Sequence, residues 1–299
     1  MKKSTREFIS EAKNTQNYSF WDLVHGYVYM CWPYLYISIG KGDHPLANAL
    51  SSITSAAGRL FPDRKTQTKS PPEGRGFAEG YHGKVLPLET AKELVSIKQD
   101  IRVENLEQVV PFERARDIIL KNPDHIAVID CPCRKGMDHH CEPMDVCLII
   151  GEPFVSFMLE HQPDSSRAIT SSEAKQILED EARRGHVSHA FFKDAVLNRF
   201  YAICNCCSCC CGAMKAQRNG TPMIFSSGFV SHVDQEICTA CGVCVKSCQF
   251  GAISLKGKLL INEELCMGCG VCVSQCPQHA FALALDPTKP APLEISHLV

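Results

Sequence analysis

Cysteine is the residue type that sets the chemistry of this chain, since 19 of its 299 residues are cysteine. Six of them crowd into the stretch AICNCCSCCCGAM, residues 202–214: Cys204, Cys206, Cys207, Cys209, Cys210 and Cys211. The opening residues have no apolar core of a secretory signal peptide. In a long chain of this kind, an odd number of cysteines favours reduced thiols that bind metal over structural disulfides. We therefore expect metal chemistry in a cytoplasmic protein.

The most specific cysteine pattern lies near the C-terminus, where C-x2-C-x2-C-x3-C occurs twice at an offset of 28 residues. This internal repeat resembles the bacterial two-cluster ferredoxin. In such a repeat, three closely spaced cysteines bind one [4Fe–4S] cube and the fourth binds the other cube. The resemblance implies that cluster I uses Cys238, Cys241, Cys244 and Cys276, and that cluster II uses Cys266, Cys269, Cys272 and Cys248.

Other residues of this repeat fit the same interpretation, with one departure. Gly242 and Gly270 allow the backbone to bend close to cluster sulfide. Residues 252–262, AISLKGKLLIN, predict a hairpin between the two halves. The departure is Gln249, which stands where the second motif has Pro277 and makes that turn less rigid. Zinc is the alternative metal, because C-x2-C pairs also bind zinc.

A second set of thiols lies upstream in the pattern C-x-C-x7-C-x5-C: Cys131, Cys133, Cys141 and Cys147. His139 and His140 lie within this segment and are alternative ligands, although adjacent histidines in a polar loop are more often solvated. We expect these thiols to combine with the run at 204–211. The favoured outcome is two further clusters with a few spare thiols. One regular and one atypical cluster is the second interpretation, and zinc or free thiols the third.

The six thiols of the run must divide between two sides in any regular conformation. An extended run would place Cys204, Cys206 and Cys210 on one side and Cys207, Cys209 and Cys211 on the other. A helical run would group Cys206, Cys209 and Cys210 on one face, and Cys207, Cys210 and Cys211 on another. Both cases suit two metal centres better than one.

The elements that position these thiols form a pattern that occurs twice. The period of residues 111–122 predicts a helix, followed by a strand at 126–130 that leads directly into Cys131. Later, Thr170 and Glu173 predict the start of a helix that Gly185 ends, and a strand at 199–203 leads into Cys204. We therefore expect a small α/β layer with both thiol groups at the same end of the sheet.

The whole chain is of α+β or α/β class in this interpretation. We expect a helical, aromatic-rich N-terminal region with a linker at 1–80, an α/β cysteine-rich iron–sulfur domain at 81–232, and a ferredoxin-type domain with a tail at 233–299. Within these, residues 1–60 are expected to be mostly helical, 62–80 a loop and 88–97 a helix. The aromatic segment 27–39 is expected to be buried or docked on protein, with its Cys31 a core thiol.

The segments around the upstream cysteines also resemble a family of multi-cluster ferredoxin-like proteins of anaerobic bacteria and archaea. The matching residues include CPCR at 131–134, PMDVCLIIGEPF at 143–154 and FYAICNCCSCCC at 200–211, and the likeness runs from about residue 80 to the C-terminus. The resemblance implies cluster binding in an anaerobic redox setting and supplies no substrate.

Electron transfer is the function that these features favour. A formal net charge of −2 and the lack of a basic stripe argue against nucleic acid, and no P-loop or dinucleotide motif is present. We expect an iron–sulfur subunit that relays low-potential electrons between a donor and a partner oxidoreductase, in a hetero-complex. It has no membrane span, although peripheral association is compatible with the aromatic segment. The alternatives are a reductase whose atypical cluster binds substrate, and a redox-responsive regulator.

Overall fold

The structure, a computed structural model, describes residues 1–42, 80–112 and 114–295. Three helices begin the chain: α1 (Lys3–Asn14), α2 (Phe20–Cys31) and α3 (Pro33–Lys41). Ser19 and Asp22 form a reciprocal capping box that starts α2, and Pro33 occupies the first turn of α3. The expected N-terminal helices are therefore present as far as residue 41, whereas the expected helical residues 43–60 and nearly all of the linker at 62–80 lie outside the described residues.

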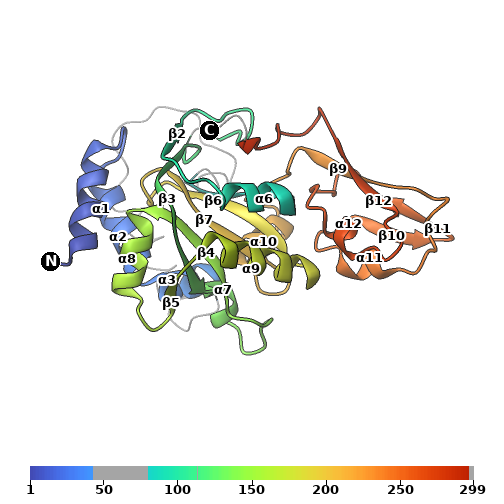
Figure 1. The fold of residues 1–299 in the computed structure, drawn as a ribbon, viewed down its shortest axis with the longest axis horizontal. Helices are drawn as coiled ribbons and strands as arrows, with labels where there is room; N and C mark the ends of the chain where they lie inside the picture. The colour runs from blue at the N-terminus through green and yellow to red at the C-terminus, as the bar shows by residue number, and fades with distance from the viewer. Residues whose placement is uncertain (43–79, 113, 296–299) are drawn as a thin grey trace, which may run out of the picture.

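A single sheet forms the centre of the molecule, in the order β2-β3-β4-β7-β6-β1-β8, with β5 beside β3 (Figure 1). Its neighbouring strands are antiparallel except for β1 and β8. A mainly antiparallel sheet with separate helices is α+β rather than α/β in class. The strands are β1 (Tyr81–Leu86), β2 (Ile101–Val103), β3 (Ile118–Asp130), β4 (Asp145–Glu152), β5 (Ser166–Ile169), β6 (Val187–Lys193), β7 (Arg199–Cys206) and β8 (Ile224–Phe225).

Helices cover both faces of this sheet. The N-terminal helices, α8 (Phe154–His161) and α10 (Gly212–Arg218) lie over one face, and α6 (Leu88–Leu94) and α9 (Ser171–Arg183) lie over the other. Strand β4 shows why both faces are apolar, because Cys147 and Ile149 enter the first core while Leu148 and Ile150 enter the second. The thiols of the sheet therefore lie in the core that the N-terminal helices cover.

The prediction of a helix at 111–122 is wrong. Residues 118–130 instead form the long strand β3, in which Ile118 and Leu120 are buried beside β2. The Asn122-Pro123-Asp124 segment is an irregularity within this strand, where the register with β4 shifts and Asn122 has a φ of 49°. Tertiary pairing thus outweighs a helical period in a short apolar segment.

The other predicted elements around the thiols are confirmed. Thr170 accepts a hydrogen bond from the Glu173 amide at 3.2 Å and begins α9, and Gly185 follows the end of that helix with a φ of 81°. The strand predicted at 126–130 is the end of β3, and the one predicted at 199–203 extends to Cys206 as β7. The helix predicted at 88–97 is shorter and ends as α6 at Leu94.

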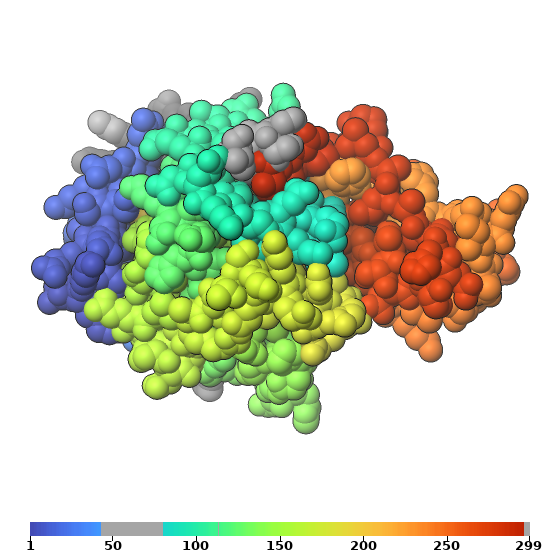
Figure 2. Space-filling model, in the orientation of Figure 1, coloured from blue at the N-terminus to red at the C-terminus, as the bar shows by residue number. Residues whose placement is uncertain are grey.

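The C-terminal region is built from small elements that stand apart from the main sheet. Strands β9 (Phe229–Val233) and β12 (Phe281–Leu285) pair, and β10 (Ile253–Lys256) and β11 (Lys258–Ile261) form the predicted hairpin. Helices α11 (Val243–Ser247) and α12 (Val271–Gln275) are one turn each. In Figure 2 the orange and red atoms of this region pack directly against the rest of the molecule at the end of α9. Among the described residues, none of the helices has the length and apolarity needed to cross a membrane.

Candidate metal centres

The cysteines of the C-terminal repeat gather into two groups that each draw on both copies of the motif. One cavity is lined by Cys238, Cys241, Cys244 and Cys276. Cys266 and Cys248 lie near Cys269 and Cys272 in the second group. These are the two crossed sets that the repeat predicts, so the geometry fits a cube in each, while iron ligation by these residues stays a prediction.

Backbone amides point at the thiols in a way that repeats between the two halves. The Ala252 amide lies 3.3 Å from the Cys248 sulfur, and the Ala280 amide lies 3.4 Å from the Cys276 sulfur. Gly242 and Gly270, with φ values of 76° and 77°, precede the one-turn helices. Amide donors of this kind stabilise the negative charge of thiolates and tune a cluster's potential.

Sheet topology brings the upstream cysteines to one end of the sheet. Strands β3 and β7 are both antiparallel to β4 and therefore run in the same direction, so that Cys131 and Cys206 emerge at the same end. Cys147 of β4 pairs directly with Cys204 of β7. Strand β3 then leads into α7 (Pro132–Lys135), and β7 leads through the cysteine run into α10, which begins at Gly212.

The cysteine run divides, but neither predicted division is the one observed. Only Cys204 and Cys206 lie on one side as the extended conformation predicts. The chain leaves β7 after Cys206 and turns through residues 208–210. The turn brings the Cys211 amide within 3.1 Å of the Cys207 carbonyl oxygen, which returns Cys211 to the side of Cys206. Cys207, Cys209 and Cys210 are left together on the other side.

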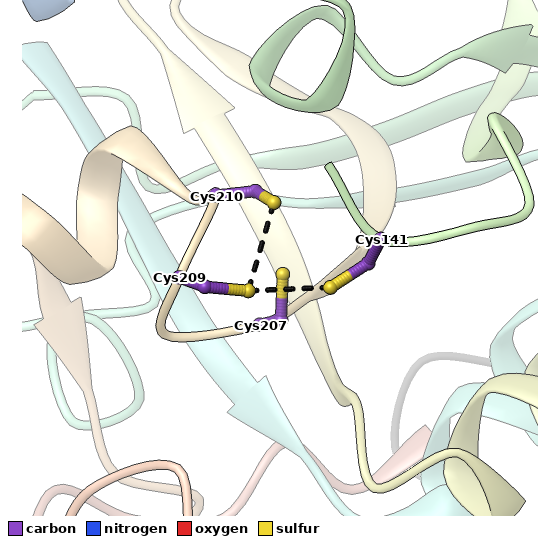
Figure 3. A group of neighbouring side chains, drawn as sticks. All are labelled: Cys141, Cys207, Cys209 and Cys210. Atoms are coloured by element: carbon purple, nitrogen blue, oxygen red, sulfur yellow. Dashed lines mark hydrogen bonds between the residues drawn. The ribbon is translucent and has the colours of Figure 1, made fainter. Parts of the chain in front are cut away.

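Those three thiols meet Cys141, which arrives on the loop between α7 and β4 (Figure 3). All four sulfur atoms lie within 4.8 Å of one another. The Cys209 sulfur is 3.2 Å from that of Cys141 and 3.6 Å from that of Cys210. We call these residues the four-thiol group.

The remaining upstream cysteines form what we call the six-thiol ring: Cys131, Cys133, Cys147, Cys204, Cys206 and Cys211. These thiols are neighbours in series, from Cys204 through Cys147, Cys131, Cys133 and Cys211 to Cys206. The Cys211 contact lowers the pKa of Cys206 to about 6. All six thiols line one cavity, together with Cys207 and Cys210.

The walls of this cavity also contain tyrosine side chains. Tyr29, Tyr81 and Tyr201 line it, and the Tyr29 and Tyr201 hydroxyl oxygens are 2.7 Å apart. Burial raises the pKa of Tyr81 and Tyr201 well above its ordinary value, so these phenols stay protonated. The Lys193 ammonium lies 4.9 Å from the ring centroids of Tyr29 and Tyr81, and burial lowers its pKa to about 8.

Arg134 of the CPCR segment gives a direct test of whether this cavity suits an anionic group. Its side chain is 1% exposed, and it lines the cavity. Its Nη atoms donate to Glu181 and to the carbonyl oxygens of Pro143 and Asn205, and one lies 3.1 Å from Nδ1 of His186, whereas its Nε atom has no partner within the described part of the chain. A buried cationic donor beside thiols fits an iron–sulfur centre in the ring, because such a centre carries negative charge.

Three further residues singled out in the sequence lie away from these centres. His139 is exposed and His140 contacts Glu142 and the Cys141 carbonyl oxygen, so neither belongs to the four-thiol group. Cys31 is buried in the core, with its sulfur 3.6 Å from Nδ1 of His161.

Sequence reasoning missed the tyrosines, Lys193 and the role of Arg134. The aromatic segment 27–39 was a signal for Tyr29, and the CPCR and FYAICNCCSCCC segments contain Arg134 and Tyr201. One face of the aromatic segment covers the cavity through Tyr29, Met30 and Ile37, whereas Trp32 remains 54% exposed.

Gln249, the departure from the ferredoxin pattern, connects the two halves of the molecule. Its side-chain oxygen accepts a hydrogen bond from the Ser208 amide at 2.8 Å, and its Nε2 donates to the Gly185 carbonyl oxygen at 2.9 Å. Ser208 lies within the cysteine run, and Gln249 directly follows Cys248. A proline at this position has no side-chain amide and would make neither bond.

Comparison with known proteins identifies the C-terminal repeat. Residues 231–254 and 259–282 each match the model of the family described as 4Fe-4S binding domain. No curated protein matches the chain. The matched residues contain both crossed sets of thiols, and residues 231–282 therefore form a 4Fe-4S ferredoxin-like domain that supports a role in iron–sulfur electron transfer.

Proposed function

We propose that this protein is a multi-cluster electron carrier in which the ferredoxin-like domain exchanges electrons with an iron–sulfur centre held by the six-thiol ring. Two cubes in the ferredoxin-like domain would each supply one-electron, low-potential redox chemistry. In this proposal the chain relays electrons between a donor and a partner oxidoreductase, as the subunit of a cytoplasmic redox complex. The resemblance of the CPCR and NCCSCCC segments to multi-cluster proteins of anaerobes supports the same proposal.

The observation that carries the proposal is the contact between Gln249 and Ser208. Cys248, assigned to cluster II, directly precedes Gln249, and Cys206 of the six-thiol ring lies two residues before Ser208. A short path of covalent and hydrogen bonds therefore joins the two thiol regions. The ferredoxin-like domain is also held in place by Gln275, whose Nε2 donates to the Ala182 and Arg183 carbonyl oxygens at the end of α9.

A reductive titration followed by electron paramagnetic resonance tests this function. Anaerobically purified protein is expected to show the two ferredoxin-type signals and at least one further iron–sulfur signal. Cys133→Ser in the ring should remove only the further signal, whereas Cys31→Ser, a buried thiol outside the ring, should leave all signals unchanged. If Cys133→Ser retained every signal and all its iron, a centre in the ring would be refuted.

A reductase acting at the six-thiol ring is the second candidate. The specific observation in its favour is the set of proton-holding groups, namely the three tyrosine hydroxyls of the cavity wall and the Lys193 ammonium, which lies against the rings of Tyr29 and Tyr81. A pure electron carrier has no need of such groups, whereas reduction of a disulfide or another sulfur compound consumes protons. A change in the ring centre's spectrum on addition of a disulfide, lost in Tyr201→Phe with iron content retained, would favour this candidate over simple relay.

A further inference from the structure

The spacing of sulfur atoms differs between the thiol groups of this protein. Within the described residues, the four-thiol group is the set of metal-ligating side chains whose atoms all lie within 4.8 Å of one another. The thiols of the ferredoxin-like domain, all of which are described, form no group of three or more with that spacing. The ferredoxin sets therefore serve as an internal reference for how this structure spaces the ligands of a cube.

This difference has a simple cause in metal coordination. A cube offers four separate iron atoms, so its four thiolates lie around the outside of a cluster and far apart. A single ion binds all four thiolates itself. With metal–sulfur distances of about 2.3 Å in a tetrahedron, the sulfur atoms lie about 3.8 Å apart. The Cys141–Cys209 and Cys209–Cys210 separations of 3.2 and 3.6 Å are near the spacing for one ion.

From this geometry we propose that Cys141, Cys207, Cys209 and Cys210 bind one tetrahedral metal ion, with zinc as the expected metal, and not an iron–sulfur cluster. This proposal replaces one of the two expected upstream clusters with a single ion. It rests on the proposed function only in assuming that the six-thiol ring holds an iron–sulfur centre. Four protein thiolates leave no open coordination position, which is the arrangement of a structural zinc site.

The location of the four-thiol group indicates what such an ion does. Cys141 lies on the loop between α7 and β4, whereas the other three ligands lie on the turn that follows β7. Cys207 and Cys210 are also part of the cavity wall. One ion therefore ties the two thiol-bearing connections together and fixes the wall of the six-thiol cavity from outside.

Metal analysis of the full chain, purified without oxygen, distinguishes one ion from a cluster. We expect about one zinc and about 12 iron atoms per chain, on four irons for each of three cubes, rather than about 16 iron atoms. Cys209→Ser should lose the zinc and keep the iron with its resonance signals. Cys133→Ser is the matched control, which should lose iron and keep zinc.

Cobalt gives a second readout that does not depend on how the Cys209 variant folds. Protein produced with Co2+ should show the charge-transfer and visible bands of a tetrahedral cobalt tetrathiolate, and Cys141→Ser should weaken them. A single high-spin iron lost in Cys209→Ser would equally support a one-ion site. Loss of about four iron atoms in Cys209→Ser, with no zinc in the parent protein, would overturn the proposal. That result would not contradict the proposed electron-transfer function, because the Cys133→Ser variant tests that function separately.

Discussion

Arg134 is the residue that links the thiol loops to the body of the protein. It lies in the CPCR segment, yet its guanidinium reaches Glu181 of α9 at 2.6 Å, as well as the carbonyl oxygen of Pro143 in the loop that bears Cys141. Glu181 is 1% exposed and also contacts His186 at 2.7 Å. A buried carboxylate with these partners depends on the arginine for its charge balance.

We expect Arg134→Met to reduce the free energy of unfolding by about 3–5 kcal/mol, since it leaves the buried Glu181 without its main cation. Denaturant unfolding of the protein, carried out without oxygen, measures this change in free energy. Arg184→Met is the matched control: Arg184 contacts the other Glu181 oxygen from a side chain that is 44% exposed, so its loss should cost under about 1 kcal/mol. Equal losses in the two variants would contradict the assigned role of Arg134.

The same group of residues predicts how stability depends on pH. Burial opposes ionisation of Glu181, but hydrogen bonds from His186 and Arg134 hold its pKa below the ordinary value. A carboxyl group of this kind stabilises the fold above the unfolded pKa of about 4.3, and this contribution is lost as pH falls through the folded pKa. The Glu181→Gln variant should therefore lose part of the acid-side slope of unfolding free energy against pH. An unchanged slope would show that Glu181 is not held ionised in the fold.

At the scale of elements, the end of α9 is the surface on which the ferredoxin-like domain docks. Gln275 bonds to Ala182 and Arg183 there, and Gln249 bonds to Gly185 and to Ser208 of the cysteine run. The two glutamines flank the two cysteines that cross between clusters in the ferredoxin pattern. The orientation of the domain is therefore set next to its proposed cluster ligands.

We expect Gln249→Pro, which restores the ferredoxin pattern, to loosen this docking while both ferredoxin-type clusters remain bound. The variant loses two hydrogen bonds of about 0.5–1.5 kcal/mol each, so hydrogen exchange at the Ser208 amide should accelerate by about tenfold. Magnetic coupling between cluster II and the ring centre should also weaken. Gln278→Ala, an exposed change in the same domain, is the control. Unchanged exchange at Ser208 in the proline variant would argue against the bridge.

At the scale of the whole molecule, the two parts differ in what holds them together. The main sheet has an extensive apolar core on each face, whereas the largest core of the ferredoxin-like domain contains only Cys244, Ile253, Leu259, Cys272 and Phe281 as buried members. Two of those five side chains are proposed cluster ligands. A domain with so little apolar burial depends on its metal centres for stability.

Removal of iron by a chelator under reducing conditions should therefore unfold residues 231–282 and leave the main sheet folded. Hydrogen exchange with mass spectrometry is the measurement, and we expect protection of β10, β11 and β12 to fall to that of an unfolded chain. Protection of β3, β4 and β7 should persist away from the thiols. Retention of full protection in the ferredoxin-like domain after complete loss of iron would contradict this dependence.

The amino-acid sequence by itself identified the ferredoxin-like domain and predicted its eight cluster ligands, because the repeat specifies local loops whose thiol spacing depends little on the rest of the chain. It also predicted correctly that β3 and β7 end at the thiols, and that the helix from Thr170 ends near Gly185. These features depend on neighbours in the sequence, on strand ends and on helix caps.

Only the tertiary structure decided which of the upstream thiols lie together. The turn through residues 208–210 brings Cys211 back to Cys206, and β4 brings Cys147 beside Cys204. Cys141 reaches the turn from a loop that is 66 residues away from Cys207 in the chain. Strand pairing and turn direction set these contacts, and neither can be deduced from the alternation of cysteines within the run.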